Sequence, residues 1–182
     1  ITQKQIINIL KLKKTSTMSL ENDLNNLKRD KFVSLFGAIF EKTEWIAEKL
    51  LEHKPFKDKD DLINKMFQIY ETTKKNDILD ILRSHPKLAI EKNLTQFSSQ
   101  EQSQANLKNC TEDEYEEFKI LNNEYEKKFG FPFIIAVKDK TKIEILNNFR
   151  QRINNDIELE YNEAKNQVKK IALFRLNELF TK

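Results

Sequence analysis

The stretch Leu-Arg-Ser-His-Pro-Lys-Leu, residues 82–88, marks a point where a helix has to stop. The segment before it, residues 75–82, is apolar enough to be a short helix with a buried end. Pro86 disfavours helical dihedrals at His85, so this helix is expected to end there. Proline also suits the first position of a helix, because its missing N–H would have no partner there. The stretch therefore predicts a second helix starting at Pro86, with His85 at or just before its N-cap.

His85 has two interpretations at this stage. The positive end of a helix dipole disfavours a protonated imidazole, and a neutral imidazole can accept a proton near neutral pH. That interpretation makes His85 a candidate acid/base. The other is a histidine that only caps a helix. The second histidine of the chain, His53, lies in a polar connection and is expected to be an exposed loop residue.

Length and composition favour an all-α protein. The 182 residues fit one domain. Two glycines and three prolines are too few for the many turns of an all-β fold. We expect a single-domain helical bundle with short connections over residues 20–182, preceded by an arm or short helix at residues 1–19. Gly37 lies inside an apolar pattern over residues 31–51, which Asp30 is expected to cap, and would let another helix approach closely.

Several classes of protein are disfavoured. The net charge of +3 comes from interspersed acids and bases, whereas a nucleic-acid binder is expected to concentrate its basic residues on one face. One cysteine excludes an internal disulfide, and two distant histidines form no metal-ligand cluster. No apolar run reaches the length of a membrane span. We expect a protein that binds neither nucleic acid nor membrane.

One segment is expected to be extended and buried. Gly130 should end a helix in the left-handed conformation, and the apolar residues 131–137 follow it. No convincing second strand is available to pair with them, so a buried connector is preferred to a strand. Its backbone N–H and C=O groups need partners, and a polar ligand is one way to supply them.

Two further features are candidates for binding. Ser98 and Glu101 have the spacing of a capping box, and the polar cluster around them starts a helix whose N–H groups could instead meet an anionic ligand. Arg175 lies on the inward stripe of the last helix, where a guanidinium needs an anionic partner. That partner is either Glu41 or Glu101, in a structural pair, or a ligand.

A series of short motifs runs in order from about residue 20 to residue 180. They are Phe32 and Gly37 leading to Glu41 and Trp45; His85-Pro86-Lys87-Leu88-Ala89; Ser98-x-x-Glu101-Gln102 with Ala105 and Leu107; Leu121-Asn122 with Tyr125; Lys128-Phe129-Gly130-Phe131-Pro132-Phe133-Ile134; Phe149-Arg150-Gln151-Arg152 with Asn154; and Ile171-Ala172 with Arg175-Leu176. In this combination the chain resembles the 2-oxo-4-hydroxy-4-carboxy-5-ureidoimidazoline (OHCU) decarboxylases of the urate-to-allantoin pathway. The Gly130 segment is the most specific motif. Asn106 is a departure, because the family usually has glycine there.

The resemblance implies an all-helical fold, no cofactor, no metal, and loss of CO2 from OHCU to give (S)-allantoin. It also favours a homodimer. The chain does not end in the peroxisomal Ser-Lys-Leu signal, and residues 1–12 do not read as a signal peptide. We therefore expect a cytoplasmic location.

The resemblance also assigns roles. His85 would be the catalytic acid/base, and Glu101 would orient its imidazole or bind ureido N–H groups. Arg175 would pair with the substrate anion, with Arg152 as the second choice. The expected substrate-binding set is Pro86, Ser98, Ser99, Gln100 and Gln102, together with the backbone of Phe133, Ile134, Ile135, Ala136 and Val137.

Two other functions are weighed against this one. The chain could be a catalytically inactive helical interaction module that keeps the same fold. The presence of every candidate catalytic residue argues against that alternative. A nucleic-acid-binding protein is the least favoured alternative, because its affinity would have to come from a concentrated positive charge that the sequence lacks.

Overall fold

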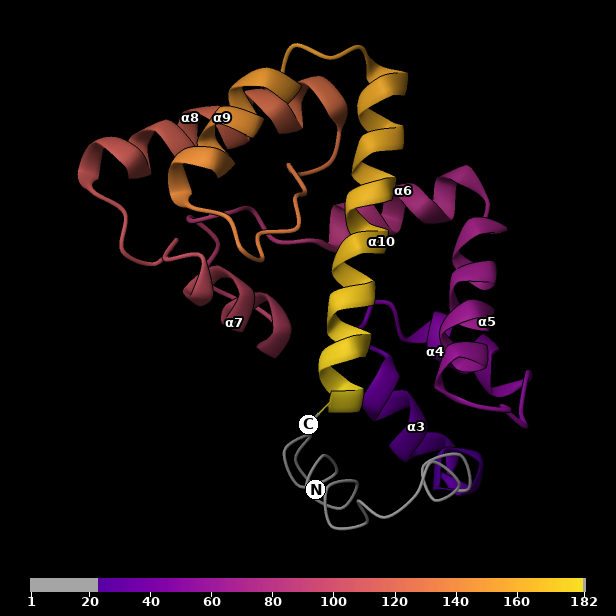
Figure 1. Ribbon diagram of the computed structural model, residues 1–182. Helices are drawn as coiled ribbons and strands as arrows, with labels where there is room; N and C mark the ends of the chain where they lie inside the picture. The colour runs from indigo at the N-terminus through magenta and orange to yellow at the C-terminus, as the bar shows by residue number, and fades with distance from the viewer. Residues whose placement is uncertain (1–22, 182) are drawn as a thin grey trace. The chain divides into compact units, whose positions relative to one another are not determined.

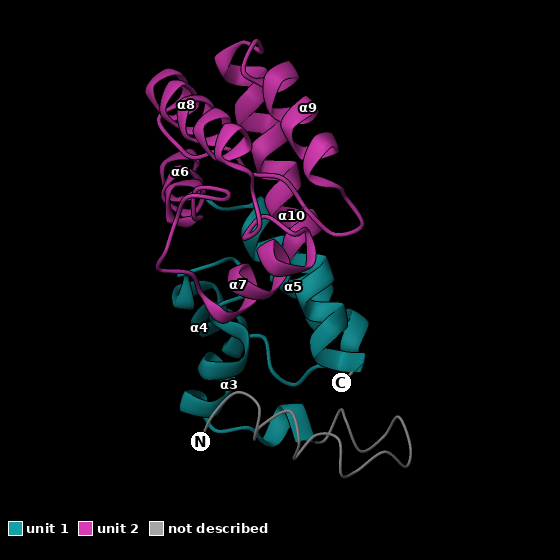
Figure 2. Ribbon diagram, turned by 90° about the vertical axis from the view of Figure 1, so that its left-hand side faces the viewer, with its two compact units in different colours: residues 1–74, 172–182 teal, residues 75–171 magenta. Residues whose placement is uncertain are grey.

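The computed structural model describes residues 23–181, which contain helices and no strand (Figure 1). This confirms the all-α class. The predicted arm at residues 1–19 and its boundary lie outside the described part. The chain divides into two compact units, residues 1–74 with 172–182 and residues 75–171 (Figure 2). We call them unit 1 and unit 2. No helix between residues 23 and 181 has both the length and the apolar character needed to cross a membrane.

Unit 1 contains α3 (Arg29–Phe36), α4 (Glu44–Leu51), α5 (Lys59–Glu71) and the last turns of α10 (Ile157–Thr181). α4 packs against both α3 and α5. The core is aromatic: the Phe40 and Tyr70 rings stack with centroids 4.7 Å apart, and Phe32 lies 4.7 Å from Phe36. These side chains are almost completely buried, so hydrophobic burial is the main stabilising term in this unit.

The apolar pattern over residues 31–51 forms two helices, because the chain turns between residues 37 and 43. α3 begins at Arg29 with Lys28 at its N-cap, so the prediction that Asp30 caps it is wrong. Gly37 follows the last residue of α3. A Cβ atom at Gly37 would lie 2.6 Å from the carbonyl oxygen of Val33 and 3.0 Å from Cγ of Glu44. The predicted close approach is therefore real, and the approaching residue is the first of α4.

Unit 2 contains α6 (Lys75–Ser84), α7 (Gln96–Gln104), α8 (Glu112–Phe129), α9 (Lys142–Arg152) and α10 as far as Ile171. α8 and α9 pack side by side (Figure 1). Thr111 and Thr141 each cap the helix that follows in a complete capping box. Gly130 ends α8 with φ of 76°, as predicted for a left-handed C-terminal residue.

Residues 131–137 form the predicted extended segment. They belong to no helix or strand, and every one of them is buried. The Phe133 ring stacks on Phe149 of α9 at 3.9 Å, and Tyr125 of α8 meets Phe133 edge-on at 5.3 Å. The segment is thus held between α8 and α9 by aromatic packing, and its backbone lies where hydrogen-bond partners are needed.

Candidate active site

His85 directly follows the last residue of α6 and is buried. Its backbone N–H donates to Leu82 O at 3.2 Å, and its Nδ1 lies 2.9 Å from Ile81 O. A carbonyl oxygen can only accept, so Nδ1 must carry the hydrogen. In the neutral ring, Nε2 is then the nitrogen with the lone pair. This arrangement allows Nε2 to accept a proton and to return it.

No helix starts at Pro86. Residues 85–95 form turns and irregular backbone, and the next helix begins at Gln96. The prediction that His85 lies at the N-cap of a new helix is therefore wrong. His85 instead lies at the C-terminal end of α6, which carries the negative end of the helix dipole. Pro86 ends a helix as expected, but the nine residues that follow it, 87–95, pack through tertiary contacts and do not continue as a helix.

α7 carries the predicted polar cluster. Thr95 is its N-cap, and the Thr95 hydroxyl accepts from Ser98 N. The capping-box interpretation of Ser98 and Glu101 is therefore wrong, because the helix begins two residues before Ser98. Residues 98, 101 and 102 lie three and four positions apart, so their side chains share one face of α7. Ser98 and Gln102 on that face are buried.

Gln102 joins this face of α7 to the segment after His85. Its Oε1 accepts from the backbone N–H of Ala89 at 3.0 Å. This bond fixes the orientation of the amide, because only its oxygen can accept. The Nε2 atom of Gln102 is buried and has no hydrogen-bond partner among the described residues. Gln102 therefore presents a buried donor close to the segment that contains His85.

The backbone of the extended segment forms hydrogen bonds with other parts of the protein at several points. Arg152 donates to Ile134 O at 2.9 Å, and Gln167 accepts from Ala136 N at 2.9 Å. Lys140 N donates to Val137 O at 3.1 Å. Side chains and a turn of the protein thus satisfy some of the backbone N–H and C=O groups for which a polar ligand was considered as a partner.

Arg152 is buried within an ion-pair network. Its Nη2 lies 2.5 Å from Glu160 Oε1, and its guanidinium lies 4.6 Å from the centre of the Phe133 ring. Tyr125 also donates its hydroxyl to Glu160. Burial raises the pKa of Tyr125, and the hydrogen bond to Glu160 raises it further, so the phenol remains a donor. Arg152 therefore supports the extended segment, with its charge matched by Glu160.

Arg175 belongs to unit 1, whereas the other predicted site residues belong to unit 2. Its Nη1 lies 2.9 Å from Glu41 Oε2, and both side chains are almost completely buried. It also donates to Ala38 O at 3.1 Å. Of the two glutamates considered as structural partners of Arg175, Glu41 is the one that pairs with it. The role of Arg175 toward a substrate anion stays a prediction.

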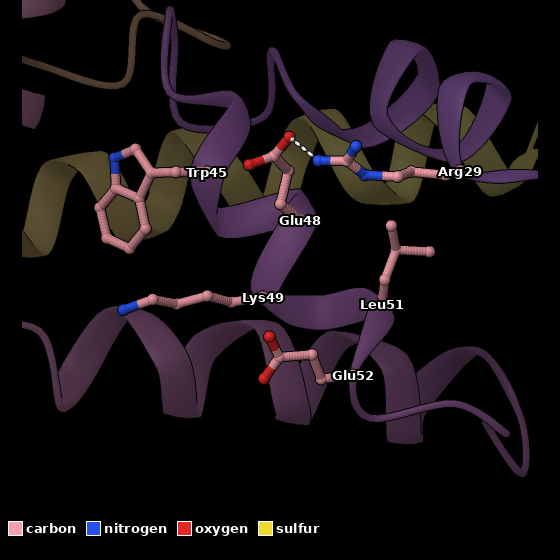
Figure 3. Close-up of a pocket in the computed structure, with 6 residues that line it drawn as sticks. All are labelled: Arg29, Trp45, Glu48, Lys49, Leu51 and Glu52. Carbon is pink, nitrogen blue, oxygen red and sulfur yellow. Dashed lines mark hydrogen bonds and ion pairs between the residues drawn. The ribbon is translucent and has the colours of Figure 1, made fainter.

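Unit 1 also has a surface pocket that the sequence did not indicate (Figure 3). It is lined by Arg29, Trp45, Glu48, Lys49, Leu51 and Glu52. Arg29 and Glu48 pair at 2.6 Å on the exposed surface. None of the predicted site residues lines this pocket. Between residues 23 and 181, no group of three or more His, Cys, Asp or Glu side chains is arranged to hold a metal ion.

Comparison with known proteins gives a family match over most of the chain. The family model described as OHCU decarboxylase matches residues 25–177. The chain is 35% identical over 158 residues to the 2-oxo-4-hydroxy-4-carboxy-5-ureidoimidazoline decarboxylase of Haloferax volcanii, covering 87% of this chain and 94% of that one. It is 39% identical over 157 residues to the uric acid degradation bifunctional protein of Bacillus sp. (strain TB-90), covering 86% of this chain. It spans only 31% of the length of that bifunctional relative.

Solved structures give a consistent result. A crystal structure of (S)-allantoin synthase aligns with a TM-score of 0.71 and 29% identity, covering 87% of this chain and 53% of that one. A crystal structure of OHCU decarboxylase in the presence of (S)-allantoin aligns with a TM-score of 0.66 and 23% identity, covering 80% of this chain and 96% of that one. The second likeness, at this identity, concerns the fold alone.

Proposed function

The chain belongs to the OHCU decarboxylase family, and from that premise we propose that it converts OHCU to (S)-allantoin and CO2. One observation carries the proposal. The hydrogen bond from Ala89 N to Gln102 Oε1 joins the segment after His85 to the polar face of α7 within unit 2. A proton-transferring imidazole and a buried amide donor are thus held by neighbouring parts of one compact unit.

The chemistry needs little beyond positioning and proton transfer. The bond between the hydroxyl-bearing ring carbon and its carboxylate breaks, and CO2 leaves. The electron pair of that bond is accepted by the adjacent C=N of the ring, whose nitrogen takes up a proton from water, so no separate electron sink is needed. The resulting enol loses its hydroxyl proton and becomes a carbonyl, and the ureido-bearing carbon gains a proton. Overall, the substrate gains two protons and loses one, so one proton replaces the carboxylate that leaves as CO2, and no oxidant or reductant is required.

We assign the proton transfer to His85. The Ile81 carbonyl holds Nδ1 as a donor, which leaves Nε2 of the neutral ring to accept the hydroxyl proton of the substrate. The same nitrogen then returns or relays a proton to one face of the enol. Delivery of the proton to a single face accounts for a single enantiomer of the product, because an enol in free solution takes its proton from either face.

The remaining predicted residues would orient the substrate. Gln102 Nε2 is a buried donor, and a carbonyl oxygen of the ring or ureido group would satisfy it. Ser98 would bind a second carbonyl, and Glu101 would orient the imidazole or accept from ureido N–H groups. Pro86, Ser99 and Gln100 would complete the substrate-binding residues on this side of the ring. The opposite ring edge would meet backbone groups of residues 133–137.

We also propose that the protein acts in the cytoplasm as a homodimer. Both proposals depend on the resemblance to the family. Sedimentation of the purified chain would test the second, since a dimer would have twice the monomer mass of 21.7 kDa.

The proposed activity can be tested with freshly generated OHCU. We expect the chain to accelerate the loss of OHCU and to yield an excess of (S)-allantoin, followed by circular dichroism. OHCU alone should decay slowly to a racemate. Equal rates and racemic product with and without the chain would show that it is an inactive module of the same fold.

A further inference from the structure

We propose that Asn122 is a positioning residue for this reaction, acting through the peptide group that joins Leu88 to Ala89. This inference depends on the proposed function, and no catalytic contact is assigned to Asn122 itself. Asn122 lies in α8, on the face that also carries Phe118 and Tyr125, and it is almost completely buried. An amide in the middle of an apolar stripe is unusual, because a leucine there would be buried without polar atoms.

Two side chains clamp a single peptide group. Asn122 Nδ2 donates to Leu88 O at 3.1 Å, and Gln102 Oε1 accepts from Ala89 N at 3.0 Å. Leu88 C=O and Ala89 N–H belong to the same peptide bond, and in a trans peptide they point in opposite directions. Two buried amides, one from α7 and one from α8, therefore hold this peptide at both of its polar atoms.

The residue that follows this peptide has an unusual backbone conformation. Ala89 has φ of 65°, in the left-handed region. A residue with a Cβ adopts this region at a cost, and it persists only where the surrounding structure imposes it. Asn122 and Gln102 are the groups that fix the peptide immediately before Ala89. The clamp therefore maintains a strained turn four residues after His85.

Within residues 23–181, the side-chain nitrogen of Asn122 is fully hydrogen-bonded, whereas its side-chain oxygen is not. Its Nδ2 donates to Phe118 O at 2.7 Å as well as to Leu88 O, so both N–H groups are used. Its Oδ1 is buried and has no hydrogen-bond partner among the described residues. A buried acceptor in this state destabilises the fold. Leucine would avoid that cost, so we attribute the amide to its hold on the Leu88 carbonyl.

The consequence reaches the site through Gln102. Because the Ala89 N–H holds Gln102 Oε1, the clamped peptide sets the direction of the Gln102 Nε2 donor. The clamp also fixes the backbone between residues 85 and 89, because it holds the peptide at the end of that stretch. Loss of Asn122 should therefore loosen both the substrate donor and the imidazole. It should lower kcat more than it raises KM, because the groups remain present but are poorly placed.

Asn122→Leu is the main test, with Asn123→Leu as its control. Asn123 is the next residue of the same helix and is exposed, so both variants make the same chemical change. We expect Asn122→Leu to lower kcat about tenfold and to accelerate hydrogen exchange of the Ala89 amide about tenfold, from the loss of one hydrogen bond. Asn123→Leu should leave both quantities within about twofold. Asn122→Ala provides a second variant in case the leucine does not fold.

A rescue experiment separates positioning from other roles. Glycine adopts positive φ without strain, so Ala89→Gly combined with Asn122→Leu should recover at least about threefold of the lost kcat. Unchanged Ala89 exchange in both Asn122 variants would overturn the clamp. Faster exchange with an unchanged kcat would overturn its role in the reaction. A wild-type chain without OHCU turnover would refute the proposed function, and the exchange rates would still decide whether the clamp exists.

Discussion

His85→Asn is the most direct test of the proposed mechanism. In the wild-type protein, Nδ1 of His85 donates to Ile81 O at 2.9 Å. The side-chain amide of asparagine branches at the same carbon as the imidazole, so its nitrogen can replace Nδ1 in that hydrogen bond. The atom that has no counterpart in asparagine is Nε2. The substitution therefore retains the structural contact and removes the proposed proton carrier.

Because His85→Asn keeps the structural hydrogen bond and removes only Nε2, its effects on rate and on stability can be estimated separately. Loss of a positioned acid/base lowers the rate about 10²- to 10⁴-fold, which corresponds to about 2.7 to 5.5 kcal/mol in the barrier. The stability should change by less than about 1 kcal/mol, because the hydrogen bond to Ile81 O is kept. His53→Asn is the matched control, since His53 is the other histidine of the chain and is exposed.

The assay is stereospecific formation of (S)-allantoin from fresh OHCU, paired with urea denaturation of each variant. We expect His85→Asn to fold with near wild-type stability and to lose turnover, while His53→Asn keeps both. Turnover of His85→Asn within about threefold of the wild type would remove this imidazole from the mechanism. A loss of activity that matches a loss of folded protein would assign His85 to the fold.

Two further predictions concern charge. Glu160→Gln leaves the guanidinium of Arg152 buried without a counter-charge, so the free energy of unfolding in urea should fall by about 3 kcal/mol or more. The control Glu158→Gln, at the exposed start of α10, which also carries Glu160, should cost less than about 0.5 kcal/mol. Equal losses of stability in the two variants would contradict the buried-charge explanation. The hydrogen bond from Lys142 holds the pKa of Glu114 below its usual value of 4.5, so its ionised form stabilises the fold above that pH and the effect disappears as pH falls through the lowered pKa. The Tm difference between wild type and Glu114→Gln, which keeps the capping box, should therefore be largest at neutral pH and shrink below about pH 4.5; a difference that grows in acid would refute the assignment.

Features that depend on neighbours in the sequence could be predicted from the sequence. Gly130 ends α8 in the left-handed conformation, because a helix end of this kind is decided within a few residues. The burial of residues 131–137 was likewise predictable, since seven apolar positions followed a helix end and had no partner strand. The His85, Gln102 and Ser98 motifs were grouped as a set through the resemblance to the family.

Features that depend on tertiary contacts could not be predicted in this way. Pro86 satisfied the local rule for a helix start, yet residues 85–95 are held by α7 and α8 and do not form a helix. The sequence also offered Ser98 as a cap, when Thr95 three residues earlier fills that position. Asn122 gave one usable signal, a polar residue on an apolar stripe. Its partner, the Leu88 carbonyl, becomes apparent only once α8 is placed.

The departure at Asn106 has a simple structural reason. Asn106 has φ of 57°, in the left-handed region, which asparagine tolerates better than most residues with a side chain. Its Oδ1 also accepts from Asn109 Nδ2 at 2.7 Å. Glycine adopts this region without strain, so the backbone observed here at residue 106 accommodates either residue.

The ion pair between Arg152 and Glu160 restricts how this lineage can change. Either residue, if replaced alone, strands a charge in the interior, whereas replacing both at once with apolar residues of similar size can be harmless. Stepwise change of the pair would then pass through a destabilised intermediate, so selection for a stable fold retains both residues even where neither side chain takes part in chemistry. A laboratory library that varies the two codons jointly has no such barrier, and it should recover folded sequences that stepwise mutation rarely reaches.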